Sequence, residues 1–142
     1  MTRLDDLLTM TRLSLVILVL VGLAGAGCKS NTSPSDLLTG TWNGTLFSVA
    51  EGPGTARVTF NQSGSSLSGT WLIVTASGQG GGTLSGTVNG SAVSAVFEPS
   101  IPTACPYSVT GTVSGNRRRL TGTYATFLCT LSLTGTFDLE RD

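Results

Sequence analysis

The chain has 142 residues, of which 11% are charged, with eight basic and eight acidic side chains and no histidine. This length suits a single domain, and the zero net charge gives no cluster of positive charge to neutralise nucleic-acid phosphates. The missing histidine removes the commonest general base and the commonest zinc ligand. We therefore expect no nucleic-acid partner and no metal site.

An uncharged apolar run, LSLVILVLVGLAGAG at residues 13–27, follows Arg3 and Arg12. As a helix it would reach about 22 Å, short of the roughly 30 Å hydrocarbon core of a bilayer. A short apolar run between basic and small residues is typical of a cleaved signal peptide. We assign residues 1–27 to it, with Met10 as a candidate true start because Met-Thr-Arg-Leu recurs there.

The small residues lead directly into Cys28, and Gly25-Ala26-Gly27-Cys28 resembles the lipobox of bacterial lipoproteins. The resemblance implies that the Cys28 thiol receives diacylglycerol and anchors the chain in a membrane of the cell envelope. The alternatives are an ordinary signal peptide before an unmodified cysteine, or an uncleaved anchor. Residues 28–38 would then be a flexible tether. By similarity to enterobacterial sorting, Lys29 implies the outer membrane, facing the periplasm or the cell surface.

A short repeat organises the predicted domain, residues 39–142. Leu-Thr-Gly-Thr-Trp at 38–42 recurs in variant form at 67–71, 84–88, 109–113, 120–124 and 133–137. Large apolar residues and glycine share one parity in each copy, while serine and threonine share the other. This period of two is typical of half-buried strands, so the sequence predicts an all-β domain.

Turn chemistry divides this domain into eight strands. Asn89-Gly90 between alternating runs is a strong hairpin signal, and Gly115-Asn116 and Ser63-Gly64-Ser65 act similarly. Longer connections are expected at 50–54, 76–82 and 98–106, and near 128–130. The predicted strands are 40–49, 55–62, 66–74, 83–89, 91–97, 107–114, 117–126 and 131–140.

Eight consecutive strands form an antiparallel up-and-down meander that can close into a small barrel, which removes exposed sheet edges. Glycine on the inward parity favours tight coiling. The alternatives are an open sheet and a β-sandwich. The predicted inward residues are Trp42, Leu46, Val58, Phe60, Leu67, Trp71, Ile73, Leu84, Val88, Val93, Phe97, Val109, Val113, Leu120, Tyr124, Leu133, Phe137 and Leu139.

In this meander the tight turns lie at one end and the longer connections at the other, which we call the loop end. Binding residues gather on loops, and an eight-stranded barrel can hold one small ligand. Inward Trp71, Phe97 and Tyr124 are therefore the candidate walls of a small apolar ligand site. With so many large inward residues, a mostly filled interior is expected.

Gly40-Thr41-Trp42 at the start of the first strand resembles the Gly-x-Trp motif of lipocalins and related calycins. In that family the tryptophan packs at the closed barrel end near an arginine that follows the last strand. The resemblance implies that Arg141 lies beside Trp42. It supports the fold more than a function.

Cys105 and Cys129 each lie six residues before the glycine of a repeat copy, so both belong at the loop end. An even pair in an oxidising compartment predicts a disulfide. Strands six and eight are separated by strand seven, however, about 9–10 Å apart if flat, beyond the roughly 7 Å limit on Cα separation. Curvature or loop excursion must close that gap.

The remaining charges carry little chemistry. Arg117, Arg118 and Arg119 at the tight-turn end could attract anionic headgroups, although a solvated strand start that discourages edge pairing is the favoured interpretation. Glu51 and Glu98 fall in different connections at the loop end. Without a nucleophile–base arrangement or a catalytic motif, we expect no enzymatic activity and no cofactor.

The sequence thus predicts a membrane-anchored lipoprotein with a β-barrel domain. Its partners would be the membrane, through the N-terminal lipid, and a small apolar ligand. The alternative is a protein-interaction or envelope-structural module with a filled barrel and no ligand. A cavity lined by Trp71, Phe97 and Tyr124 would favour the first function, and a filled interior the second.

Overall fold

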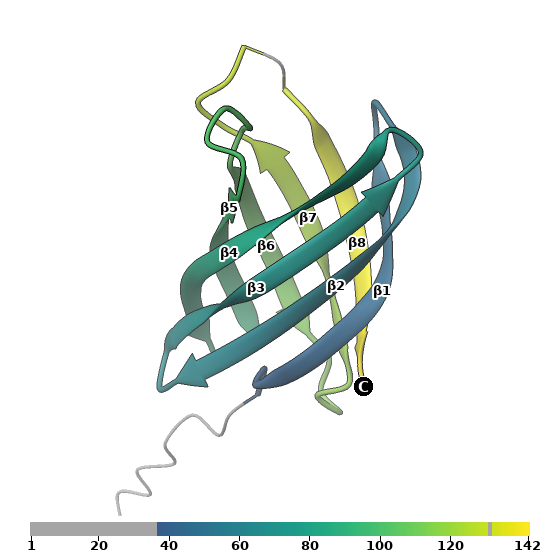
Figure 1. The fold of residues 1–142 in the computed structure, drawn as a ribbon. Coiled ribbons are helices and arrows are strands. Elements are labelled where there is room, and N and C mark those ends of the chain that lie inside the picture. Colours follow the sequence, from purple (N-terminus) through teal and green to yellow (C-terminus); the bar gives the residue numbers. More distant parts are fainter. Residues whose placement is uncertain (1–36, 131) are drawn as a thin grey trace, which may run out of the picture. The chain divides into compact units, whose positions relative to one another are not determined.

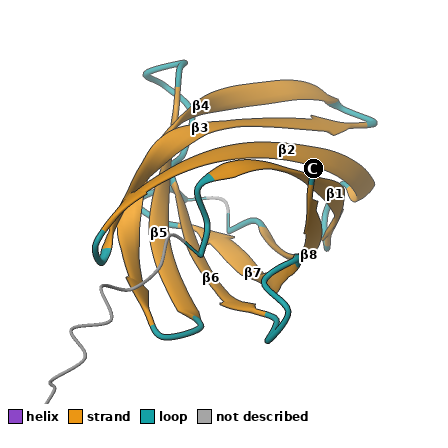
Figure 2. Cartoon of the chain, turned by 90° about the horizontal axis from the view of Figure 1, so that it is seen from below, coloured by secondary structure: helices purple, strands orange, loops and turns teal. Residues whose placement is uncertain are grey.

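The computed structural model describes residues 37–130 and 132–142, which form a closed antiparallel β-barrel (Figure 1). Each strand pairs with the next, and β1 pairs with β8 to close the sheet, so the strands form a ring (Figure 2). The predicted fold class is confirmed. The strands are β1 (Gly40–Ser48), β2 (Gly52–Ser63), β3 (Ser66–Thr75), β4 (Gly78–Asn89), β5 (Ala92–Pro99), β6 (Tyr107–Val113), β7 (Arg119–Thr126) and β8 (Thr134–Arg141).

The predicted signal-peptide helix, Cys28 and most of the tether lie outside the described residues. Within residues 37–130 and 132–142, no helix is long and apolar enough to cross a membrane. The predicted tether extends to residue 38, but Leu37 packs against the core and Leu38 is fully buried in it.

Alternation along the strands becomes alternation between core and solvent. In β2, Ala56, Val58 and Phe60 are buried while the residues between them face outward or are only partly covered. All the predicted inward residues except Leu133 lie in the core or pack against it. Leu133 is in the β7–β8 connection, because β8 begins only at Thr134. Leu37, Leu38, Ala56, Ala95 and Tyr107 join the core without having been predicted.

Glycine is required where neighbouring strands approach most closely. A Cβ on Gly122 of β7 would overlap the carbonyl oxygen of Thr110 on β6, and the ring of Phe137 occupies the remaining space. On β3, a Cβ on Gly69 would overlap the carbonyl oxygen of Thr59. The small residue thus allows the sheet to coil into a narrow barrel.

Two connections expected to be long are tight turns. β2 begins at Gly52 and β4 at Gly78, so the predicted loops at 50–54 and 76–82 are mostly strand. The glycine-rich run of β4 pairs with β3, where Gly80 is opposite Ile73. The ring of Trp71 covers Gly80, with ring carbons 3.8 and 3.9 Å from the position of a Cβ. Pairing with β3 and the cover of this ring keep the glycine-rich segment in a β-strand, although its composition suggests a loop.

The β6–β7 connection, by contrast, is longer than the sequence predicts. It spans 114–118, so Arg117 and Arg118 belong to the turn and the strand begins at Arg119. Arg117 has a φ of 59°, the left-handed region. The long connections are therefore those between β5 and β6 and between β7 and β8. Their described residues, 100–106, 127–130 and 132–133, lie near each other at the upper end of the barrel in Figure 1.

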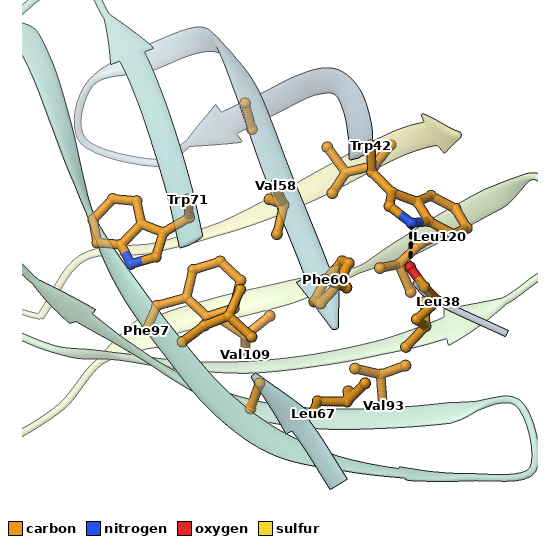
Figure 3. Packing of buried hydrophobic residues seen from close by; sticks show 14 of the residues in the cluster. Leu38, Trp42, Val58, Phe60, Leu67, Trp71, Val93, Phe97, Val109 and Leu120 are labelled. Atoms are coloured by element: carbon orange, nitrogen blue, oxygen red, sulfur yellow. Dashed lines mark hydrogen bonds between the residues drawn. The ribbon is translucent and has the colours of Figure 1, made fainter. Parts of the chain in front are cut away.

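The opposite end is closed by the segment that enters β1. Trp42 Nε1 donates a hydrogen bond of 2.8 Å to the carbonyl oxygen of Leu38 (Figure 3). The Arg141 guanidinium lies over the Trp42 ring, 5.1 Å from its centroid, and donates to the carbonyl oxygen of Leu37 at 2.8 Å. Gln62 Oε1 accepts hydrogen bonds from the backbone amides of Leu37 and Leu38, at 2.9 and 3.1 Å. The predicted Trp42–Arg141 neighbourhood is confirmed, and this is the closed end.

Candidate functional site

An apolar cavity lies inside the barrel, with a volume of about 40 Å³. Such a volume would admit water, but an apolar cavity stays dry, and benzene binding is known for a cavity of about 150 Å³. The interior is therefore mostly filled by side chains, as expected from the sequence. The lining residues are Leu46, Ala56, Val58, Phe60, Ile73, Val93, Ala95, Phe97, Tyr107, Val109, Leu120, Tyr124, Phe137 and Leu139.

Side chains at the two ends of the core differ in how deeply they are buried. Trp42, Phe60, Leu38 and Leu120 are fully buried toward the closed end. Wall residues on the strand segments nearer the loop end, among them Tyr107 and Tyr124, are only partly buried. The loop end is therefore the side from which a ligand could reach the cavity.

Four aromatic side chains gather at the loop end, and we call them the aromatic cluster: Trp71, Phe97, Tyr107 and Tyr124. Trp71 stacks on Phe97 with centroids 5.8 Å apart, as seen at one side of the core in Figure 3. Tyr107 meets Trp71 edge to face at 5.8 Å, and meets Tyr124 in the same way at 5.9 Å. Such offset and edge-to-face pairs are favourable arrangements of aromatic quadrupoles.

The structure brings together the three residues predicted as ligand walls. Phe97 and Tyr124 line the cavity, whereas Trp71 does not, and its Nε1 donates to the carbonyl oxygen of Thr83 at 3.0 Å. Tyr107 links the predicted residues but was missed. It shares the inward parity of Val109, so the alternating pattern contained its signal.

A polar rim borders the aromatic cluster at the end of β1. Ser48 is only 2% exposed and pairs with Gly135, which in turn pairs with Tyr124. This register allows the Tyr124 and Ser48 side chains to form a hydrogen bond. The amide of Glu51, in the β1–β2 turn, donates to Ser48 Oγ at 3.3 Å. Ser48 and Glu51 therefore lie beside the tyrosines at the mouth of the cavity.

Both tyrosine hydroxyls stay protonated at neutral pH. Burial raises the pKa of Tyr107 above its usual 10.0, and the negative charge of Glu51 raises it further. Burial also raises the pKa of Tyr124, partly offset by the Ser48 hydrogen bond, and Glu51 again adds to the increase. The rim thus offers neutral hydroxyl donors and one carboxylate.

Charge is distributed unevenly between the two ends. Glu51 lies in a loop-end turn, whereas the side chain of Glu98 is exposed on the outer parity of β5. At the other end, Arg117 and Arg118 are exposed in the β6–β7 turn. Arg119 forms a bidentate ion pair with Asp138, which holds the pKa of that carboxyl below its usual value.

Cys105 and Cys129 form the predicted disulfide, with Cα atoms 6.0 Å apart. Both lie beyond the ends of the strands, in the β5–β6 and β7–β8 connections, so the separation of β6 from β8 within the sheet does not apply. The amide of Phe127 also donates to the carbonyl oxygen of Pro106 at 3.2 Å. The two long connections are thus joined across the end of β7.

These features define a class: a closed, eight-stranded, up-and-down β-barrel with one sealed end and a nearly filled, aromatic-rich opposite end. Neither a protein-family model nor a curated protein matches the sequence. The fold does match solved β-barrels.

The first similar structure is EF1p2_mFAP2b bound to DFHBI, with a TM-score of 0.66 and 14% sequence identity over 78% of this chain and 98% of that one. A redesigned β-barrel, mFAP1, bound to DFHBI, has a TM-score of 0.65 and 18% identity over 78% of this chain and 100% of that one. A third, the redesigned barrel b11L5F_LGL, has a TM-score of 0.64 and 15% identity, covering 75% and 93%. At these identities the likeness shows the fold alone.

Proposed function

We propose that this chain is a lipid-anchored protein of the cell envelope whose barrel binds a small apolar ligand through the loop end. The observation that carries the proposal is the apolar cavity beneath the aromatic cluster, on the side where Tyr107 and Tyr124 are only partly buried. Small-molecule sites are concave and mostly apolar, with a few polar groups that fix orientation. Ser48 and the tyrosine hydroxyls supply those groups here.

Barrels of the same fold lend support, since EF1p2_mFAP2b and mFAP1 are bound to DFHBI. The cavity of about 40 Å³ is smaller than a ligand would need. Side chains at the mouth must therefore move on binding, and the partly buried Tyr107 and Tyr124 have the most freedom to do so.

The anchoring half of the proposal is supported by the lipobox-like sequence that ends at Cys28. Leu37, the first described residue, lies at the closed end. A lipid on Cys28 would hold that end toward the membrane and leave the loop end free to receive a ligand. We infer binding rather than catalysis, because the cavity wall holds no acid, base or nucleophile beyond the two tyrosines.

The test is native mass spectrometry of the exported chain, compared with Ala95→Val and Ala92→Val. Ala95 lines the cavity, so two added methyl groups would fill it, whereas Ala92 is exposed on the same strand. We expect a co-purifying small molecule on the parent and on Ala92→Val, and its loss on Ala95→Val. A bare mass for all three proteins would contradict ligand binding. Lipidation is read from the mass of the N-terminal fragment and its loss in Cys28→Ala.

The small cavity favours a second candidate, a protein-interaction or envelope-structural module. Two exposed apolar side chains on the outer face of β3 add to it: Leu72 and Val74 are 42% and 43% exposed. Exposed apolar patches mark interaction sites when they are contiguous. A photo-crosslinking residue in place of Leu72 should then capture one envelope protein, while the same residue at Thr110, on the outer face of β6, should not.

A further inference from the structure

We propose that the loop end recognises an organic cation, whose ammonium head lies between the aromatic cluster and Glu51 while a short apolar tail enters the cavity. This inference rests on the proposed function and specifies its ligand class. It follows from ring geometry, from the position of one carboxylate and from the distribution of charge in the described residues.

The rings form a corner rather than a flat wall. Tyr107 is inclined at 86° to Trp71 and at 78° to Tyr124, so successive ring planes are nearly perpendicular. A group in such a corner can meet ring faces from more than one direction. Ring faces carry negative potential and attract ammonium groups, and aromatic cages for alkylated amines use this arrangement.

Glu51 supplies the formal charge that the rings lack. Its amide donates to Ser48 Oγ at 3.3 Å, and Ser48 lies opposite Gly135, the register partner of Tyr124, so the turn that carries Glu51 lies beside this tyrosine. The negative charge of Glu51 also raises the pKa of both tyrosines. Among residues 37–130 and 132–142, one ion pair is present, between Arg119 and Asp138. Glu51 therefore has no cationic partner in the described part of the barrel.

The other basic residues of the described chain lie away from the mouth. The arginines of the β6–β7 turn and Arg141 are at the closed end, and Arg57 projects from the outer face of β2, where its register partners are Asn43 and Leu72. An anionic ligand would find at the mouth a carboxylate and the negative faces of rings. A cation would find both favourable, because charge complementarity sets specificity at a partly desolvated site.

The size and the apolar wall of the cavity determine what kind of tail the ligand can carry. Its wall is apolar and offers nothing to a second polar group. With about 40 Å³ of free volume, it holds a short unbranched tail only after the side chains at the mouth have moved. The head remains at the rim, where the Ser48 and tyrosine hydroxyls lie. The expected ligand class is thus a small amphipathic amine or quaternary ammonium compound.

The experiment is isothermal titration calorimetry of the exported chain with hexyltrimethylammonium, hexanol and hexanoate, which share a tail and differ in charge. We expect the cation to bind about tenfold more tightly than hexanol, and hexanoate to bind most weakly. If hexanol and the cation bind equally, ligand binding stands and the cation inference fails. If no probe binds, the proposed function fails with it.

Glu51→Gln and Glu98→Gln form a matched pair of variants, because both residues are exposed but only Glu51 acts on the tyrosines. We expect Glu51→Gln to remove most of the preference for the cation while the affinity for hexanol is unchanged. Glu98→Gln should retain the preference. An equal loss in both variants would mean that overall charge, and not this site, attracts the cation, and would overturn the inference.

Discussion

At the residue scale, the two ends of the barrel use aromatic side chains differently. Trp42 is completely buried, and its indole N–H and ring face are both occupied, by Leu38 and Arg141. Tyr107 and Tyr124 are partly exposed, the Tyr124 side chain is hydrogen-bonded to Ser48, and the charge of Glu51 acts on both tyrosines. The first arrangement seals an end, and the second leaves polar groups at a mouth.

The two tyrosines are the only ones in the chain, so their ionisation can be followed without interference. Phenolate absorbance should appear above pH 10.0, because burial and Glu51 raise both pKa values. The unfolded chain loses these protons first, so the free energy of unfolding should fall as the pH rises above that value. Glu51→Gln should lower the titration midpoint. If this variant leaves the titration midpoint unchanged, the charge of Glu51 does not act on the tyrosines.

At the element scale, cross-strand approach decides where side chains are tolerated. In β7, Gly122 is opposite Gly111 of β6, and Phe137 of β8 fills the space over both. In β4, the glycine run lies under Trp71. Glycine in a strand weakens its intrinsic preference, but here it makes room for large inward rings, and the packing of those rings offsets the cost.

Gly122→Ala should therefore destabilise the barrel by at least about 2 kcal/mol, as overpacking against a rigid neighbour does. The added Cβ would overlap the Thr110 carbonyl oxygen, which cannot move without breaking the β6–β7 ladder. Gly115→Ala is the control, since a Cβ there meets nothing within 4 Å. Chemical denaturation measures both. Similar midpoints for the two variants would show that the sheet can relax.

At the scale of the whole molecule, closure and one covalent link hold the barrel. The β1–β8 pairing leaves no unpaired sheet edge, and the disulfide joins the two longest connections at the loop end. The mouth is thus bordered by a linked pair of connections on one side and by the tight turns of β1–β2 and β3–β4 on the other.

The double substitution of Cys105 and Cys129 by alanine should lower the free energy of unfolding by about 3.5 kcal/mol, since the disulfide closes a loop with a sequence separation of 24. Because the link lies beyond the strand ends, far-ultraviolet circular dichroism should remain that of a β-barrel. Reduction of the parent protein should give the same loss. A barrel that unfolds on reduction would assign the disulfide a larger role than loop closure.

The alternation of apolar residues with serine and threonine determined most of the fold. It determined the inward parity and the all-β class, because a period of two allows one face of each strand to be buried. The turn residues determined the number of strands. Errors fell where composition and pairing disagree. Gly78 and Gly80 were predicted in a loop but are held in β4 by β3, and Leu133 was predicted inward but precedes β8.

The candidate site was less accessible from sequence. Parity could place Trp71, Phe97 and Tyr124 on the inner face, because it follows from local backbone geometry. That Tyr107 joins them, that Glu51 lies beside the tyrosines and that the cavity is small depend on the register between distant strands and on how side chains fill a closed ring. The sequence by itself determined which faces of the strands are buried, through the local period of two, and which strand ends are joined, through local turn residues. Only the tertiary structure decided what meets inside, because packing in a closed barrel depends on all eight strands at once.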